Sequence, residues 1–193
     1  MDWNRLRDER LAVIADLSAR APDGVLGRTA IMKLCYFLQV LKGVPLGYRF
    51  TLYSYGPFDS DVLSDLGTAE SLGAVNSVID YYPGGYGYKI QKAAGNEAVV
   101  SLGSHFLDRY RASIDWVLSE FGSLKSADLE LQSTIIFVDR EADRKSKELE
   151  LTRLASQVHD IKPHFSESSI LENAIRLYEK GILLRARPAM ATA

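Results

Sequence analysis

The fold is decided by residues 27–43, GRTAIMKLCYFLQVLKG, which a short link joins to residues 48–58, YRFTLYSYGPF. Further apolar side chains cover most of the circumference of the first segment, and a helix that is apolar on most sides must be buried on most sides. We therefore expect a central core helix that ends at Gly43, because glycine commonly follows the last helical turn. Its main apolar face has the i, i+3, i+4, i+7 spacing of a helix and consists of Ile31, Leu34, Cys35, Leu38 and Leu41.

The second segment has the alternation of a half-buried strand. Residues 49–55 are rich in aromatic side chains, with Phe50 and Leu52 on the same face, a pattern typical of strands with one covered face. Pro57 has no N–H for a ladder hydrogen bond. We therefore expect it to end the strand at a corner formed by residues 55–57.

The composition indicates one domain, with or without a small appendage. The chain has 193 residues, of which 47% are hydrophobic and 25% are charged, which is enough apolar side chain for a core. The formal net charge of -2 gives no general basic character of the kind that nucleic-acid binding uses. The amino terminus lacks the apolar run of a signal peptide, and no segment reads as a membrane span. We expect a cytoplasmic protein without membrane contact.

The residue types that usually perform chemistry are sparse. The single cysteine, Cys35, cannot form a disulfide within the chain, and free cysteine is among the most buried residue types, so a structural thiol is favoured over a nucleophile. His159 and His164 flank Pro163 and lack helical metal-ligand spacing, and His105 stands alone. We therefore expect no enzymatic activity, no bound metal and no cofactor.

The remaining sequence predicts an α+β fold that is mostly α. Expected helices cover residues 2–19, 59–73, 102–121, 126–139, a segment ending near 161, and 166–181; a hairpin covers residues 74–92, and residues 98–100 form a third short strand. The order of elements predicts a winged-helix-like part over residues 1–101 and a helical part over residues 102–184, packed as one compact unit. A disordered tail is expected over residues 185–193. Periodicity does not distinguish internal packing of the 102–121 helix from a homodimer.

Several short motifs occur in an order that resembles the YwgA-like proteins, which are related to the SocA/Panacea group of phage-associated, antitoxin-type proteins. The matching positions in the first half are Lys33, Leu34, Tyr36, Gln39, Tyr53, Tyr55, Gly56, Pro57 and Asp61. Residues 129–137 and 161–166 resemble the YwgA-like branch in the second half. The resemblance implies a regulatory protein that binds a toxin or another defence component.

The candidate partner-binding surface is the Tyr-Gly-Pro corner together with the acidic helix that follows it. Exposed aromatic side chains suit interface anchors, and charged side chains suit the surrounding rim. The alternative is that the corner residues only fasten this turn to the core. The predicted partner-binding residues are Tyr53, Tyr55, Gly56, Pro57, Phe58, Asp59, Asp61 and Asp65.

A winged-helix DNA-binding regulator is the second hypothesis. The segment from Asp59 to Leu72, where a recognition helix would lie, carries four acidic residues and no basic one, and the wing offers only Lys89 and Lys92. Phosphate contacts supply much of the affinity for DNA, so this charge pattern disfavours nucleic acid. The tyrosines between Tyr48 and Tyr88 can stack on single-stranded bases, but pairing within a hairpin explains most of them.

Overall fold

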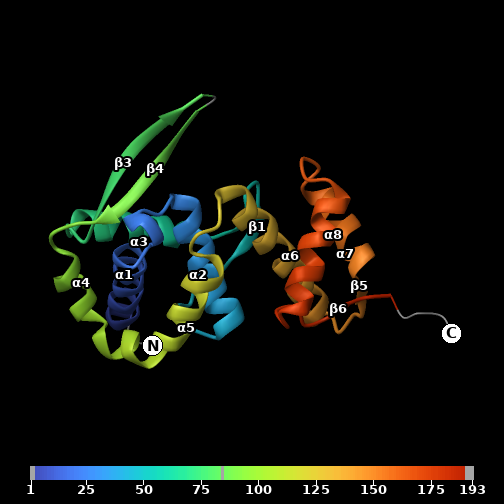
Figure 1. The fold of residues 1–193 in the computed structure, drawn as a ribbon. Coiled ribbons are helices and arrows are strands. Elements are labelled where there is room, and N and C mark those ends of the chain that lie inside the picture. Colours follow the sequence, from blue (N-terminus) through green and yellow to red (C-terminus); the bar gives the residue numbers. More distant parts are fainter. Residues whose placement is uncertain (1–2, 84, 190–193) are drawn as a thin grey trace. The chain divides into compact units, whose positions relative to one another are not determined.

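The chain forms two compact units. The computed structural model describes residues 3–83 and 85–189 (Figure 1). Unit 1 comprises Met1–Thr51 and Phe58–Ser126, and unit 2 comprises Leu52–Pro57 and Ala127–Ala193. The fold class is α+β and mostly α, as predicted.

Unit 1 contains α1 (Trp3–Ala19), η1 (Pro22–Gly24), α2 (Arg28–Lys42), α3 (Ser60–Ser71), β3 (Val75–Tyr82), β4 (Gly85–Lys92), α4 (Asn96–Leu102) and α5 (Ser104–Phe121). The chain passes into unit 2 and back through β1 (Thr51–Tyr53) and β2 (Gly56–Phe58). The other elements of unit 2 are α6 (Ser126–Arg144), β5 (Leu149–Glu150), α7 (Leu151–Ile161), α8 (Glu167–Glu179) and β6 (Ala186–Arg187).

Helix α2 is the core helix that the sequence predicted. Every residue from Ala30 to Leu38 is buried, and α2 packs against α3, α5 and β4. The ring of Phe37 stacks on that of Phe121 in α5, with 4.1 Å between the ring centroids. The helix ends at Gly43, whose φ of 64° lies in the left-handed region that glycine adopts without strain. Local spacing and a terminal glycine were sufficient to predict this element.

The predicted strand over residues 49–55 is shorter, and the role given to Pro57 was wrong. The strand is Thr51–Tyr53, and Pro57 lies inside its partner β2 rather than ending the strand. A two-stranded sheet has a free outer edge on each strand, so proline is tolerated there without loss of a ladder hydrogen bond. The corner is therefore the turn of a small hairpin.

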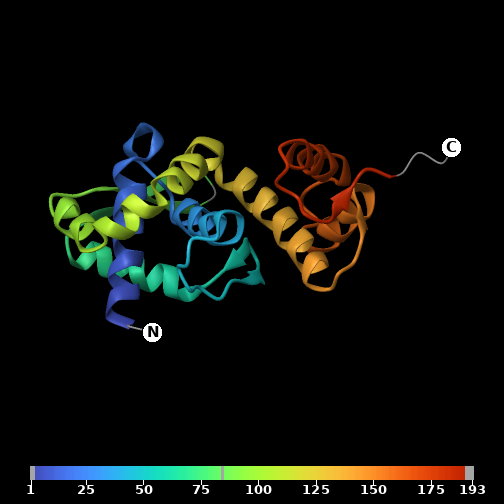
Figure 2. The ribbon, with the colours of Figure 1, turned by 90° about the horizontal axis from the view of Figure 1, so that it is seen from below.

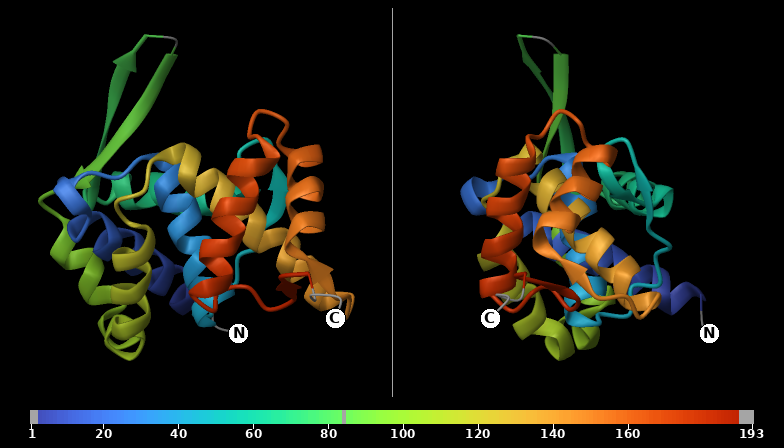
Figure 3. Two further views of the ribbon diagram at one scale, coloured as in Figure 1. Left: turned by 45° about the vertical axis from the view of Figure 1, so that its right-hand side comes forward. Right: turned by 90° about the vertical axis from the view of Figure 1, so that its right-hand side faces the viewer.

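The predicted hairpin over residues 74–92 is confirmed. Strands β3 and β4 pair antiparallel in a continuous register from Val75 opposite Lys92 to Tyr82 opposite Gly85. The hairpin extends away from the helices of unit 1 (Figure 3). Gly84, within the predicted range of the hairpin, lies outside the described residues.

The predicted third strand over residues 98–100 is wrong, because this segment belongs to helix α4. The side-chain amide of Asn96, at the start of α4, donates to the carbonyl oxygens of Ala15 at 2.9 Å and Ala74 at 3.1 Å. These two buried hydrogen bonds fasten the start of α4 to α1 and to the segment before β3. A run of valines favours a strand only where a neighbouring strand offers hydrogen bonds, and α4 instead packs on α1.

The boundary between the units differs from the one expected at residue 101. Helix α5 begins after Gly103, and a Cβ at Gly103 would lie 2.6 Å from the side chain of Ala12 in α1. This close approach, together with the stacking of Phe37 on Phe121, holds α4 and α5 in unit 1. The chain therefore divides near Ser126 into two units, whereas the sequence had suggested one.

Unit 2 is mainly helical, and its helices begin near the predicted residues. Helix α6 continues without a break to Arg144, beyond the predicted end at residue 139 (Figure 2). Helices α7 and α8 pack against each other. The Ser166 hydroxyl caps α8 by accepting a hydrogen bond from the Ser169 N–H at 3.3 Å, in agreement with the predicted helix start at residue 166.

The segment predicted as a disordered tail is partly ordered. Strand β6 pairs in parallel with β5, and the buried carboxylate of Asp139 accepts hydrogen bonds from the backbone N–H groups of Leu184, Arg185 and Ala186 at 2.8–2.9 Å. One side chain of α6 thus supplies acceptors to three successive amides. Residues 190–193 lie outside the described residues.

Candidate functional site

The eight predicted site residues divide between the two units. Tyr53, Tyr55, Gly56 and Pro57 belong to unit 2, whereas Phe58, Asp59, Asp61 and Asp65 belong to unit 1. In each group, some residues face solvent and others hold the backbone in place.

The turn between β1 and β2 is held from behind by a buried lysine. Lys162 follows α7, and its side chain is 3% exposed. Its Nζ donates to the carbonyl oxygens of Tyr53, at 3.2 Å, and of Ser54. The same ammonium forms a 3.0 Å ion pair with the carboxylate of Glu130 in α6. A buried ammonium needs this many partners, because burial of an unpaired charge is very unfavourable.

Gly56 allows this turn to lie directly against α6. Its φ is 85°, and a Cβ there would lie 3.0 Å from the Ser133 hydroxyl oxygen and 3.1 Å from that of Thr134. Both hydroxyls donate to the backbone carbonyl of Glu130, so they cannot easily move aside. Glycine is required both by backbone conformation and by space.

The consequence of this support is that two tyrosine side chains face solvent. Tyr53 is 66% exposed and Tyr55 is 71% exposed. Gly56 and Pro57 are buried, so their role in the site is to shape the turn and not to contact a partner. A turn with fixed backbone and exposed aromatic side chains is suited to anchoring another protein, because little conformational freedom remains to be lost on binding.

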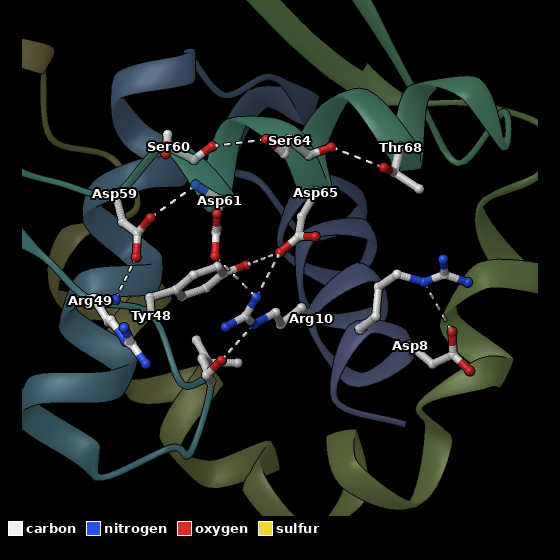
Figure 4. A network of polar contacts seen from close by, with 12 residues as sticks. Asp8, Arg10, Tyr48, Arg49, Asp59, Ser60, Asp61, Ser64, Asp65 and Thr68 are labelled. Atoms are coloured by element: carbon white, nitrogen blue, oxygen red, sulfur yellow. Dashed lines mark hydrogen bonds and ion pairs between the residues drawn. The ribbon is translucent and has the colours of Figure 1, made fainter. Parts of the chain in front are cut away.

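The acidic helix of unit 1 is less exposed than the sequence suggested. Asp65 is only 8% exposed, and it accepts a hydrogen bond from the Tyr48 hydroxyl at 2.9 Å (Figure 4). The Arg10 guanidinium lies over the Tyr48 ring, 4.2 Å from its centroid, with Nη1 3.7 Å from the Asp65 carboxylate. Asp65 is thus part of the interior of unit 1, and its assignment to the partner-binding surface is a correction.

Burial dominates the protonation of this cluster. It raises the pKa of Asp65, while the hydrogen bond from Tyr48 and the charge of Arg10 act in the opposite direction. Burial also raises the pKa of Tyr48 well above its usual value. Gln39 of α2 fixes the backbone of Tyr48, since its side-chain amide accepts from the Tyr48 N–H at 2.9 Å and donates to the Tyr48 carbonyl at 2.8 Å. The arrangement is that of a structural cluster.

The start of α3 also has a structural explanation. The Asp59 carboxylate caps the helix by accepting from the Asp61 N–H at 2.9 Å, and it also accepts from the Arg49 N–H. Phe58 is half-buried. Asp61 remains exposed, with one carboxylate oxygen 3.8 Å from Arg10. Of the predicted acidic residues, Asp61 is the one best placed to meet a partner.

Sequence reasoning missed a second aromatic surface, on the β3–β4 hairpin. It contains the cross-strand neighbours Tyr81 and Tyr86, whose ring centroids are 6.3 Å apart, and Tyr88, 5.9 Å from Tyr86. Tyr81 is 78% exposed. The sequence feature that could have identified it is that apolar side chains continue to alternate along both strands up to the loop, beyond the part of the hairpin that contributes to the core. The tyrosines were explained by strand pairing, which is correct but leaves their exposure unexplained.

Features that would support catalysis are weak. Cys35 is completely buried, and burial raises its pKa to about 12, so the thiol stays protonated. Within residues 3–83 and 85–189, no three His, Cys, Asp or Glu side chains gather closely enough to hold a metal ion. A hollow of about 900 Å³ in unit 1 is lined by both basic and acidic side chains, among them Arg5, Asp8, Glu9 and Arg109. Its mixed charge favours neither an anionic nor a cationic ligand.

Comparison with protein-family models and with curated protein sequences finds no match for this chain. The similarity to YwgA-like proteins therefore rests on the short motifs alone. In the part of the chain that the structure describes, no helix has the length and apolar character needed to cross a membrane.

Proposed function

We propose that this chain is a non-catalytic regulatory module that binds another protein through the turn carrying Tyr53 and Tyr55. The observation that supports the proposal is the combination of two largely exposed tyrosines with a turn held by the buried Lys162–Glu130 pair. Tyrosine is enriched among residues that dominate binding energy. A prearranged turn also loses little entropy when it binds.

The setting of this activity is proposed from the sequence resemblance. YwgA-like and SocA/Panacea proteins imply a partner that is a toxin or another defence component, and a cytoplasmic location. The lysine and the glutamate that support the turn fall within residues 161–166 and 129–137, two of the segments that carry the resemblance. This coincidence gives those motifs a physical role in shaping the proposed binding surface.

A winged-helix DNA-binding regulator is the alternative, and the projecting β3–β4 hairpin is the feature that favours it. Its two lysines are already engaged, Lys89 with Asp80 at 3.0 Å and Lys92 with Glu97 at 3.2 Å. Helix α3 contains no basic residue. DNA affinity depends largely on cations that face phosphate groups, so protein binding is the better supported function.

The test is a pull-down of the tagged full chain from its own cells, with and without nuclease, followed by mass spectrometry. We expect a stoichiometric protein that survives nuclease and is lost when both Tyr53→Ala and Tyr55→Ala are introduced. Leu72→Ser, which removes an exposed apolar side chain of unit 1, serves as the matched control and should retain the partner.

Two results would contradict the proposal. Recovery of nucleic acid without a protein would favour the DNA-binding alternative, and that interaction should weaken steeply with salt. Retention of the partner by the double tyrosine variant would show that binding uses a different surface.

A further inference from the structure

On the β3 edge of the β3–β4 hairpin, two residues have outward backbone groups that receive no hydrogen bond from the described part of the chain. Leu26 and Ile90 exchange two backbone hydrogen bonds, at 3.0 and 2.7 Å, across the outer edge of β4. Both polar groups of Ile90 therefore point away from its partner Ser77. In an antiparallel ladder this orientation alternates along each strand, so the backbone groups of Ser77, Ile79 and Tyr81 all point away from β4.

Only part of this β3 edge is occupied. The Ser77 N–H donates to the Glu70 side chain at 3.0 Å, which confirms its outward direction. Among the described residues, none supplies a hydrogen bond to the outward backbone groups of Ile79 or Tyr81. The edge of β4 is less accessible, because Leu26 pairs with Ile90 near its base and the outward carbonyl of Tyr86 accepts a hydrogen bond from the Tyr82 hydroxyl at 3.2 Å.

The side chains along the free edge define what can pair with it. Ile79 is 46% exposed and Tyr81 is 78% exposed, and they lie on the same face of the hairpin. Asp80 lies on the opposite face, half-exposed, and already forms one ion pair with Lys89. The next strand would place side chains directly beside these three residues. The edge therefore favours an added strand whose successive side chains are apolar, basic and apolar.

We propose that the β3 edge binds an extended segment of a partner protein, which adds an antiparallel strand by hydrogen bonding to Ile79 and Tyr81. The segment carries apolar side chains beside Ile79 and Tyr81 and a lysine or arginine beside Asp80. Strand addition of this kind derives affinity from main-chain hydrogen bonds and specificity from alternate side chains. This surface lies in unit 1 and is independent of the Tyr53–Tyr55 turn.

A second copy of the chain fits this edge poorly. In a two-fold antiparallel pair, use of both free positions requires Ile79 of each copy to face Tyr81 of the other. That register sets Asp80 directly opposite Asp80, and like charges directly opposite are destabilising. The register centred on Ile79 instead pairs Tyr81 with Ser77, whose N–H is already bound to Glu70. Charge complementarity thus favours a different, basic segment.

The first measurement is amide hydrogen exchange of the free full-length chain by NMR. We expect slow exchange at Val78, Asp80 and Tyr82, which face β4, and fast exchange at Ile79 and Tyr81. The chain is then used to select from a phage-displayed library of random heptapeptides. Selected peptides should show the apolar, basic, apolar alternation, and their addition should slow exchange specifically at Ile79 and Tyr81.

Two variants separate strand addition from other modes of binding. Ile79→Pro removes an N–H that has no partner within the hairpin, so the hairpin should persist while peptide affinity falls at least tenfold. The control Ile79→Val keeps the N–H and should change affinity by no more than about fourfold, since it removes only one methylene. Asp80→Lys should shift the selected central residue from basic to acidic.

The proposal is overturned if no peptide is selected, or if selected peptides bind Ile79→Pro as well as the original chain. Concentration-dependent protection of Ile79 and Tyr81 without peptide would instead identify a second copy as the occupant and also overturn it. None of these results bears on the Tyr53–Tyr55 turn, because the pull-down with the double tyrosine variant tests that surface separately.

Discussion

The two hairpins of this chain both present tyrosines to solvent, but they are supported in opposite ways. The β1–β2 turn is fixed by groups from elsewhere in unit 2, above all the buried Lys162. The β3–β4 hairpin is held along most of its length by its own cross-strand pairs. Exposed tyrosines therefore occur both on a turn that a buried lysine holds and on a hairpin that leaves one strand edge open. We expect the two surfaces to respond differently to mutation.

The largest difference should appear when each hairpin loses its lysine. Lys162→Met leaves the buried Glu130 carboxylate without its ammonium partner, with His164 Nε2 3.3 Å away as its remaining ion-pair neighbour. Breaking a buried pair in this way costs about 3–5 kcal/mol. Lys89→Met removes a half-exposed pair with Asp80, and surface pairs contribute at most about 1 kcal/mol. Urea unfolding followed by circular dichroism measures both.

Trp116 lies in unit 1, so its fluorescence reports whether unit 1 stays folded when unit 2 is destabilised. Equal destabilisation by the two lysine variants would mean that the buried Lys162–Glu130 pair does not make the support of the two hairpins different.

A smaller difference should separate the glycines. Gly56→Ala forces a side chain into the left-handed region and against two hydroxyl oxygens, and strain of this kind costs on the order of 1–3 kcal/mol. At Gly87 in β4, a Cβ would meet only Tyr82, at an ordinary 3.6 Å. Gly87→Ala should therefore be neutral or slightly stabilising, because alanine restricts the unfolded chain more than glycine does. Thermal unfolding of both variants would contradict this expectation if their midpoints shifted equally.

The smallest effect concerns pH and the Arg10–Tyr48–Asp65 cluster of unit 1. The folded chain holds the Asp65 proton more tightly than the unfolded chain does, because burial raises its pKa from 3.8. This contribution to stability is fully present below the unfolded pKa and is lost as the pH rises through the higher folded value. Asp65→Asn removes it, so the free energy of unfolding of the variant relative to the original chain should rise with pH above 3.8.

Chemical denaturation over a pH series, with tryptophan fluorescence as the signal, measures this difference. The control is Asp61→Asn, since Asp61 is exposed on the same helix. A pH profile shared by both variants would assign the effect to general surface charge.

Sequence reasoning succeeded where a signal was local. The apolar spacing of α2, the serine before α8 and the alternation of β3 and β4 each define an element without knowledge of distant residues. It failed where distant groups decide the outcome. Val99 joined a helix because Asn96 binds α1 and the segment before β3, and Asp65 turned inward because Arg10 and Tyr48 receive it.

The candidate site was predicted in the same uneven way. Aromatic side chains before a Gly-Pro pair identified Tyr53 and Tyr55, whose exposure the structure shows. Nothing near them in the sequence indicates Lys162, since its contact with Tyr53 spans 109 residues. The ordering of residues 184–186 was likewise invisible, because it depends on one carboxylate in α6.

The separation between Tyr53 and Lys162 also has a consequence in time. A ribosome that adds 5–20 residues per second reaches Lys162 roughly 5–20 s after Tyr53. During that interval the carbonyl groups of the turn lack the ammonium that later fixes them, although the second segment of unit 1, Phe58–Ser126, is completed before Lys162 is reached. The turn that carries Tyr53 and Tyr55 is therefore fixed late. In a chain that has not yet reached Lys162, its backbone lacks these hydrogen bonds. Under the proposed function, recognition through this turn would distinguish chains that already include Lys162 from shorter nascent ones.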